Sequence, residues 1–147
     1  MPTARRSRTI AASGQDLWEL ISDPHHLPRW WPRVTRVEGV TQDGFTEVMR
    51  TAKGKVVRAD FELIQADEGQ LSLTWRQRLA GTPFARLLSS AETELHLAPV
   101  DGASTVVTIE LRQALTGFFP RFGAFMVRRA ATATIDEALN GLERISG

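Results

Sequence analysis

Hydrophobic and polar residues alternate through the middle of the chain, between residues 34 and 115. In QLSLTWRQRLA one phase holds Leu73, Trp75 and Gln77, and STVVTIELRQAL repeats the pattern. A period of two is typical of β-strands with one covered face and one face in water. The turn sequences TQDG, AKGK, ADEG and PVDG separate the runs, so the pattern predicts an antiparallel meander of six strands after a first strand at RTIAA.

The segment between the first strand and the meander carries helix signals that prolines interrupt. SGQDLWELISDP predicts a short helix whose first amides are capped by Ser13. Asp23 and Pro24 then form a fresh cap with proline at the first helical position, and Pro28 and Pro32 stop anything longer than a turn or so. The stretch DPHHLPRWWP is therefore expected to be a bent connector.

Helical spacing returns after residue 117. The segment predicts one amphipathic helix of about 25 residues, roughly 37 Å long, which would cross and cover the whole sheet. Small residues lie at its middle. Its expected apolar stripe contains Phe122, Phe125, Met126, Ile135, Leu139 and Leu142.

Length and charge limit the classes of protein that fit. A chain of 147 residues is the size of a single domain, here residues 1–147. With 18 Lys+Arg against 17 Asp+Glu, its net charge is too small to attract nucleic acid. Because it has no cysteine, it cannot use a thiolate as a nucleophile or metal ligand. No signal peptide and no segment apolar enough to cross a bilayer is present, so we expect a soluble, cytoplasmic protein without integral membrane association.

Histidine is the natural candidate for acid–base work near neutral pH, and His25 and His26 are adjacent in the connector. Neighbours on a helical turn point about 100° apart, so the pair is not expected to share one substrate atom or one metal ion. A zinc site needs three or four ligands, and His96 lies on an outward strand phase. We therefore expect no metal site. We expect His25 and His26 to lie exposed on a helical turn.

Polar residues on the inward strand phase are better candidates for a pocket. A buried polar group that lacks a hydrogen bond costs on the order of 1–3 kcal/mol, so each needs a partner from protein, water or ligand. By contrast, Glu92 and Glu94 lie on the outward phase, where ion pairing explains them. The inward polar residues are Glu47, Gln77, Thr93 and Gln113.

Trp30 and Trp31 each carry a large apolar area that favours burial. Two adjacent tryptophans on a bent connector can face different surroundings, so we expect one in the core and the other at a pocket mouth, in either order. The segment AGTPFARLLSSAE, with Phe84 and Leu88, interrupts the meander and is either a lid over a pocket or a loop packed on the sheet.

The opening RTIAASGQDLWELISDPHHLPRWWPRVTRVE and the ending ATIDEALNGLERI carry a family resemblance over nearly the whole chain. The chain resembles the SRPBCC, or START-like, helix-grip superfamily, and within it the bacterial polyketide cyclase/dehydrase-like group. The resemblance implies an α+β fold: a curved seven-stranded antiparallel sheet around a long C-terminal helix, with two short helices between strands 1 and 2. DPHHLPRWWP is also similar to the entrance motif of chaperone-activator-homology domains.

The resemblance implies a cavity between sheet and helix that binds a small hydrophobic molecule, either a lipid, an aromatic or a polyketide-like compound. Binding without catalysis is the first expectation. A cyclase or dehydratase would use His25, His26 or Glu47, and the alternative is a protein-interaction domain of the chaperone-activator or ubiquinone-binding, ribosome-interacting type. No cofactor is expected, and the chain is expected to be a monomer or weak homodimer. The expected ligand-binding residues are Trp30, Trp31, Met49, Phe61, Trp75, Gln77, Phe84, Leu88, Thr93, Phe122, Phe125, Met126 and Arg129.

Overall fold

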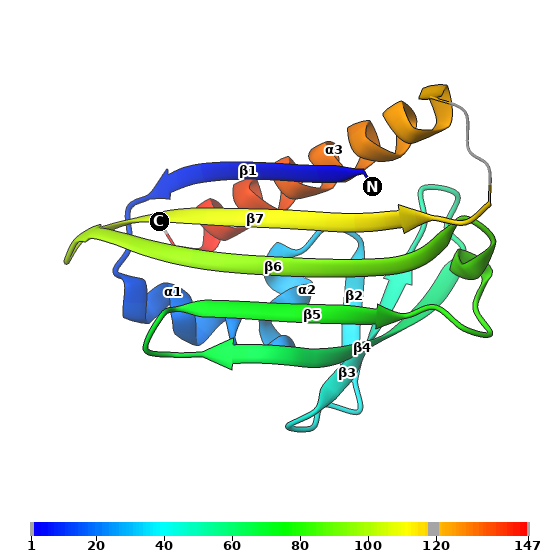
Figure 1. Ribbon diagram of the computed structural model, residues 1–147. Helices are drawn as coiled ribbons and strands as arrows, with labels where there is room; N and C mark the ends of the chain where they lie inside the picture. The colour runs from blue at the N-terminus through cyan, green and yellow to red at the C-terminus, as the bar shows by residue number, and fades with distance from the viewer. Residues whose placement is uncertain (1, 118–120, 147) are drawn as a thin grey trace.

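A computed structural model describes residues 2–117 and 121–146 of the chain (Figure 1). Seven antiparallel strands form one sheet in the order β1-β7-β6-β5-β4-β3-β2, so the first strand pairs with the last. This sheet confirms the predicted meander. The strands are β1 (Thr3–Ile10), β2 (Val34–Glu38), β3 (Gly44–Arg50), β4 (Val56–Asp67), β5 (Ser72–Arg78), β6 (Leu88–Asp101) and β7 (Ser104–Leu115).

The helices lie where the capping residues and prolines place them. Between β1 and β2 come α1 (Gly14–Ile21), the 3₁₀ turn η1 (Pro24–His26) and the single-turn α2 (Leu27–Trp30). Ser13 Oγ accepts a hydrogen bond from the Asp16 amide at 3.1 Å, and Asp23 Oδ1 accepts one from the His25 amide at 3.0 Å. A second 3₁₀ turn, η2 (Pro83–Arg86), precedes β6, and α3 (Arg121–Ser146) ends the chain.

The three α-helices lie on one side of the sheet, and α3 packs against β1, β7 and α2 (Figure 1). The α2–α3 contact is very close: a Cβ added to Gly141 would lie 2.3 Å from the Trp30 carbonyl oxygen, so this position requires glycine. No helix among the described residues is long and apolar enough to span a membrane.

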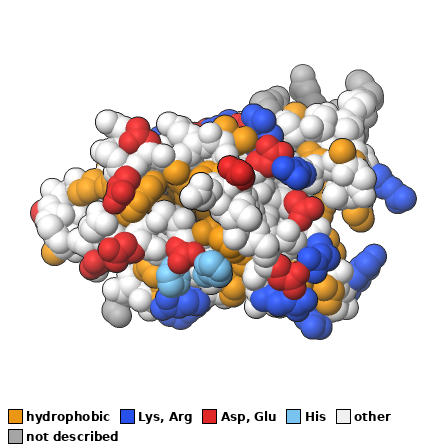
Figure 2. All heavy atoms as spheres, turned by 90° about the horizontal axis from the view of Figure 1, so that it is seen from below, with side chains coloured by type: hydrophobic (Ala, Val, Ile, Leu, Met, Phe, Trp, Pro, Cys, Tyr) orange, Lys and Arg blue, Asp and Glu red, His pale blue; other side chains and the backbone are white. Residues whose placement is uncertain are grey.

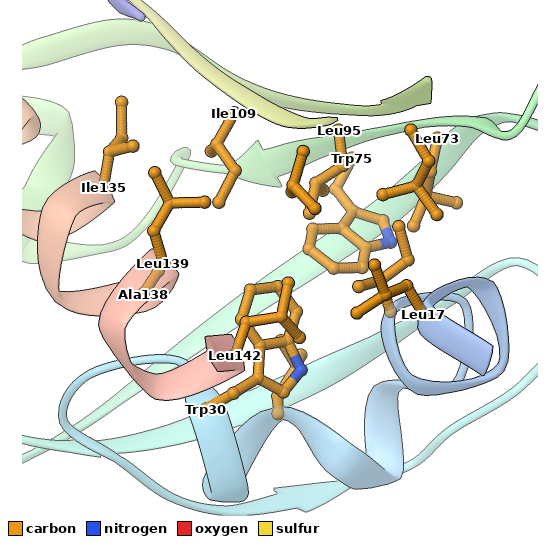
Figure 3. Close-up of a cluster of buried hydrophobic side chains, with 14 of the residues drawn as sticks. Leu17, Trp30, Leu73, Trp75, Leu95, Ile109, Ile135, Ala138, Leu139 and Leu142 are labelled. Atoms are coloured by element: carbon orange, nitrogen blue, oxygen red, sulfur yellow. The ribbon is translucent and has the colours of Figure 1, made fainter. Parts of the chain in front are cut away.

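The hydrophobic core lies under the C-terminal half of α3. Figure 3 shows helix side chains pointing toward those of the sheet and of α2. Each labelled side chain is buried, which a domain of this size needs for a stable core. The labelled core residues are Leu17, Trp30, Leu73, Trp75, Leu95, Ile109, Ile135, Ala138, Leu139 and Leu142.

The N-terminal half of α3 differs from the predicted stripe. Phe125 is 54% exposed and Met126 is 44% exposed, so the expectation that they face the sheet is wrong. The buried face that contains Ile135 continues backwards in steps of four residues to Ala131 and Val127. Phe125 lies roughly 160° around the helix from Val127 and therefore points away from the sheet. The side chain of Phe122 lies outside the part of the chain that the structure describes.

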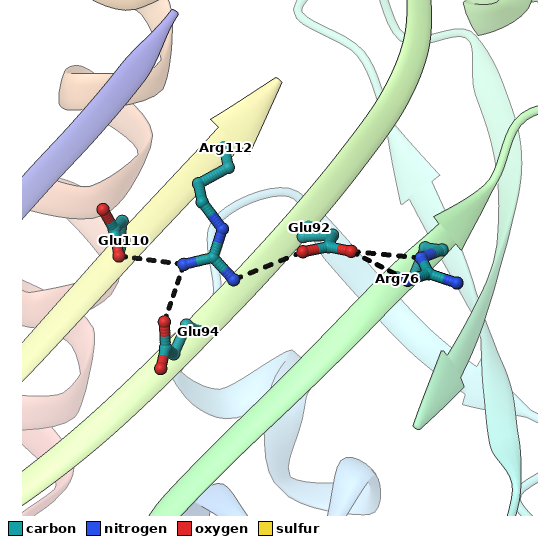
Figure 4. Close-up of polar contacts among 5 residues, drawn as sticks. All are labelled: Arg76, Glu92, Glu94, Glu110 and Arg112. Atoms are coloured by element: carbon teal, nitrogen blue, oxygen red, sulfur yellow. Dashed lines mark hydrogen bonds and ion pairs between the residues drawn. The ribbon is translucent and has the colours of Figure 1, made fainter. Parts of the chain in front are cut away.

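The outer face of the sheet carries a network of ion pairs (Figure 4). The Arg112 guanidinium donates to Glu94 at 2.6 Å, to Glu110 at 2.9 Å and to Glu92 at 3.3 Å. Arg76 donates to the other oxygen of Glu92 at 3.0 Å. These bonds raise the pKa of Arg112 and, in Glu92, outweigh partial burial and lower the pKa. Glu92 and Glu94 are therefore structural partners on the solvent side.

Candidate functional site

A cavity of about 320 Å³ lies between the inner face of the sheet and the N-terminal half of α3. Strands β3 to β7, η2, the end of α2 and α3 all contribute to its wall. The apolar lining residues are Trp31, Met49, Phe61, Phe84, Leu87, Leu88, Ala91, Leu111, Val127, Ala130 and Ala131. The polar ones are Glu47, Gln77, Thr93, Gln113 and Thr134, and Glu92 borders the cavity while its carboxylate binds arginines on the outer face.

The cavity exists because the facing side chains are small. Ala130, Ala131 and Thr134 face it from α3, and Ala91 faces it from β6. Residues of the main core line part of this space, and residues of a second small cluster built around Leu88 line another part. The protein thus has two apolar clusters with room between them instead of one continuous core.

Two other hollows have comparable volumes but different linings. One of about 410 Å³ lies beside α2 and the end of α3 and is lined by charged side chains such as Arg29, Arg33 and Arg144. Another of about 340 Å³ lies between α1 and the C-terminal residues of α3. Of the described strand residues, Val34 of β2 borders the first hollow and none borders the second, so neither hollow is covered by the inner face of the sheet as the cavity is.

The two tryptophans of the connector have different surroundings. Trp30 is 2% exposed and belongs to the core, whereas Trp31 lines the cavity. Their rings meet edge to face at 5.5 Å and 80°. Trp30 therefore supports the wall from behind, and its indole Nε1–H has no hydrogen-bond partner among the described residues.

Of the residues expected to bind a ligand, seven line the cavity, and so does Glu47. Trp75 does not, because its ring packs into the core edge to face with Phe45 at 5.3 Å. Arg129 is exposed on the same outward side of α3 as Phe125 and Met126, so none of these three contributes to the wall. The seven are Trp31, Met49, Phe61, Gln77, Phe84, Leu88 and Thr93.

Several lining residues were not among the expected ligand-binding residues. Gln113 was predicted only as an inward polar residue of the pocket, and it does line the cavity; Leu111 follows the same inward phase of β7 and could have been inferred from the alternation. Val127, Ala131 and Thr134 follow from stepping back along the buried face of α3, but their modest hydrophobicity hides this face from a search for large apolar residues.

His25 and His26 lie away from the cavity wall. His25 Nδ1 is 2.8 Å from Asp23 Oδ1, and His26 Nε2 is 3.8 Å from Asp23 Oδ2. Burial raises the pKa of Asp23, but the hydrogen bonds from His25 outweigh it and leave the pKa lowered. Figure 2 shows histidine side chains at the surface beside acidic ones. Acid–base action by these histidines on a ligand in the cavity does not fit this geometry.

Glu47 is the unusual group of the cavity. It is 3% exposed, and burial raises the pKa of its carboxyl to about 8. No hydrogen bond or ion pair to this carboxyl is found in residues 2–117 and 121–146, and burial alone shifts its pKa. At neutral pH it is mostly protonated and can donate a hydrogen bond, and when it loses its proton it can act as a base or as a counter-charge.

Within the described ranges no three histidine, aspartate or glutamate side chains converge in a way that could hold a metal ion. Glu47 is accompanied in the cavity by amides and hydroxyls, which orient a ligand through hydrogen bonds. The arrangement therefore suits a bound organic molecule with a small polar part.

The family model described as polyketide cyclase / dehydrase and lipid transport matches residues 1–147. No curated protein matches the sequence. Among solved structures, the di-domain ARO/CYC BexL from the BE-7585A biosynthetic pathway has 18% identity and a TM-score of 0.83, over 98% of this chain and 46% of that one. The chain thus spans about half of BexL.

Two solved structures that this chain matches over nearly their whole length have the same fold. A START superfamily protein from Mycobacterium smegmatis has 15% identity and a TM-score of 0.78, over 98% of this chain and 96% of that one. The Zhui aromatase/cyclase from Streptomyces sp. R1128 also has 15% identity and a TM-score of 0.78, over 98% and 92%. At these identities the likeness establishes the helix-grip fold and nothing more specific.

Proposed function

The chain belongs to the polyketide cyclase/dehydrase and lipid transport family, and we propose that it binds a small hydrophobic molecule in the cavity between the sheet and α3. The observation that carries the proposal is the space of about 320 Å³ between two apolar clusters. This volume is at the lower end of the range for small-molecule sites. A compact aromatic or a short lipid-like molecule fits it better than a long extended chain.

The lining supports this proposal in two ways. Trp31, Phe61 and Phe84 offer aromatic surface, which gains free energy when a ligand removes it from water. Gln77 and Thr93 lie among these apolar groups and can fix the orientation of a ligand through hydrogen bonds. An apolar wall with few polar groups is the usual composition of a ligand site.

Binding without turnover is the reading that the titratable groups favour. Cyclisation or dehydration of a reactive chain needs proton transfer at two places on the substrate, hence an acid and a base. Glu47 is the one ionisable side chain that turns a free carboxyl into the cavity among the described residues. A cyclase or dehydratase would therefore have to use Glu47 in both roles, with the buried carboxyl pKa of about 8 in its favour.

An interaction domain is the other function that one observation favours. Phe125 and Met126 expose large apolar side chains on the outer side of α3, as a partner surface would. Nothing in the described residues shows what would cover them, whereas the cavity has walls from both layers of the fold. Ligand binding therefore remains the proposed function.

The test is binding of phenylnaphthylamine, an uncharged apolar dye whose fluorescence rises in apolar surroundings. We expect the wild-type protein to bind the dye. We expect Ala131→Phe, whose larger side chain fills the cavity from α3, not to bind it. Ala133→Phe is the matched control, because Ala133 is exposed on the same helix. Ala91→Phe fills the cavity from the sheet and repeats the test if the first variant unfolds. Dye binding that survives both cavity-filling variants would refute the proposal.

A further inference from the structure

Glu47 lies near the middle of β3, on the face that turns toward α3. Its neighbours across the sheet are Val37 on β2 and Ala59 on β4, and neither can hydrogen-bond through its side chain. Glu47 lines the cavity and is 3% exposed as a whole residue, and its carboxyl has no hydrogen-bond or ion-pair partner among the described residues. An acidic group in this state is rare, because burying a polar group without a partner costs free energy.

Among the described residues, no positively charged side chain faces this carboxyl from the elements packed around it. The cavity wall contains no lysine, arginine or histidine among the described residues, and the one other carboxylate at its border, Glu92, is held on the outer face by Arg76 and Arg112. The cavity wall around Glu47 includes Trp31 just after α2, Phe61 from β4, Gln77 from β5, Thr93 from β6, Gln113 from β7 and Thr134 from α3.

The charges of the cavity wall favour some classes of ligand over others. An organic acid would bring a second negative or acidic group to a wall that offers it no cation, so fatty acids and other carboxylates are disfavoured. A molecule with an ammonium group would instead turn an isolated buried carboxyl into an ion pair, the usual partnership for buried charges. The wall thus lacks one component, and that component is a cation.

The rest of the lining suits the same cation. Trp31, Phe61 and Phe84 line the cavity, and an aromatic face turned toward an ammonium group would attract it through a cation–π interaction. The side-chain oxygens of Gln77 and Gln113 can accept the N–H bonds that Glu47 does not. Aromatic rings around one carboxyl, with no competing base, are an arrangement suited to organic ammonium ions.

We propose that the ligand of this cavity is a hydrophobic amine and that Glu47 is the counter-charge of its ammonium group. The inference rests on the proposed function, because it names the ligand class of the same cavity. It goes further in predicting which of several apolar molecules of equal size the protein selects.

Proton linkage gives this proposal a signature. In the empty cavity the Glu47 carboxyl has a pKa of about 8 and is mostly protonated at neutral pH. An ammonium ion binds best to the carboxylate, so its binding releases a proton, and its affinity should rise roughly tenfold per pH unit below a pH of about 8. An uncharged ligand should show no such rise.

The experiment compares naphthylmethylamine, naphthalenemethanol and naphthoate, which share one ring system and differ in the polar group. Fluorescence and calorimetric titrations of the whole chain, over a pH series from about 6 to about 8.5, measure the three affinities. We expect the amine to bind roughly tenfold or more tightly than the alcohol near the top of this series, and naphthoate to bind most weakly. Calorimetry in buffers of different ionisation enthalpy should show proton release for the amine alone.

Glu47→Gln keeps the shape of the side chain and removes its charge. We expect this variant to lose the preference for the amine, with its pH dependence, and to keep the affinity for the alcohol. Glu68→Gln is the matched control, because Glu68 lies exposed in the turn before β5 and its replacement makes the same chemical change away from the cavity. The pH series on the wild-type protein decides the question even if Glu47→Gln folds poorly.

The outcomes separate this inference from the function on which it rests. Equal affinity for amine and alcohol at every pH, or unchanged amine affinity in Glu47→Gln, would overturn the amine proposal and leave ligand binding intact. Tightest binding of naphthoate would also overturn it. Failure of all three probes to bind would count against both proposals.

Discussion

Glu47 also makes the stability of the empty protein depend on pH in a direction opposite to that of most acidic residues. Its carboxyl has the ordinary pKa of 4.5 when the chain is unfolded and about 8 when it is buried in the fold. Between these two values the folded state holds a proton that the unfolded state has released. Folding is therefore favoured by acid, and the contribution of Glu47 is lost as the pH rises through about 8.

The magnitude follows from the same two values. Each pKa unit between the folded and unfolded states corresponds to about 1.4 kcal/mol. A carboxyl whose pKa rises from 4.5 to about 8 lowers the free energy of unfolding by about 5 kcal/mol across that interval, and by about 3 kcal/mol between pH 4.5 and neutral pH. Since a domain of this class is stable by roughly 5–15 kcal/mol, the effect is large.

The assay is urea denaturation of the wild-type protein and Glu47→Gln at a series of pH values from about 4 to about 9. The difference between the two curves removes every other titrating group, because both proteins share those groups. We expect the variant to gain stability relative to the wild type as the pH rises, and the gain to level off above about 8. A difference that stays constant over this range, while Glu68→Gln behaves as the wild type, would refute the account of a buried and unpaired carboxyl.

Three further substitutions test the packing. Gly141→Ala should lower the free energy of unfolding by about 1–3 kcal/mol, because its Cβ would lie 2.3 Å from the Trp30 carbonyl oxygen; an unchanged melting temperature would contradict this contact. Arg112→Met should cost about 1–2 kcal/mol at low salt by leaving three glutamates close together, and added salt should reduce the loss. Leu139→Ala should cost about 2–5 kcal/mol and Phe125→Ser less than about 0.5, and equal losses in thermal unfolding would reverse our assignment of the two faces of α3.

The strand side of the site was predictable because a period of two is a local property. Once one inward residue such as Trp75 is identified, the alternation places Gln77 on the same face, and the same reasoning places Thr93 and Glu47 inward. The short turn sequences between the strands also predicted the meander from β2 to β7. The pairing of β1 with β7 was not predicted, because alternation alone does not tell a strand which neighbour it pairs with.

The helix side of the site was predicted less well. Because Phe125 and Met126 are large and apolar, we predicted that they belong to the buried stripe of α3. The buried face instead continues through Val127 and Ala131. A cavity is a place where side chains are too small to meet, so its wall has a weak hydrophobic signal by construction. Hydrophobic pattern therefore finds cores well and finds the walls of ligand sites poorly.

The two tryptophans show a second limit of sequence reasoning. Trp30 and Trp31 have the same chemistry and adjacent positions, so pattern could not decide which one enters the core. The choice is made from far along the chain, where Gly141 lets α3 approach the backbone of Trp30. With that backbone held against α3, the ring of Trp30 is buried and Trp31 is left to face the cavity.

The division of α3 into two halves explains how the fold tolerates a cavity. Its C-terminal half carries Ile135, Leu139 and Leu142, which are almost completely buried and hold the helix to the sheet and to α2. Its N-terminal half faces the sheet with Ala131 and leaves space unfilled, which forfeits packing free energy. Opposite this half lies Glu47, whose unpaired carboxyl lowers the stability of the empty protein further. Two features that weaken the empty protein thus meet at one place, and a ligand that fills the space and supplies the missing cation would recover both losses at once.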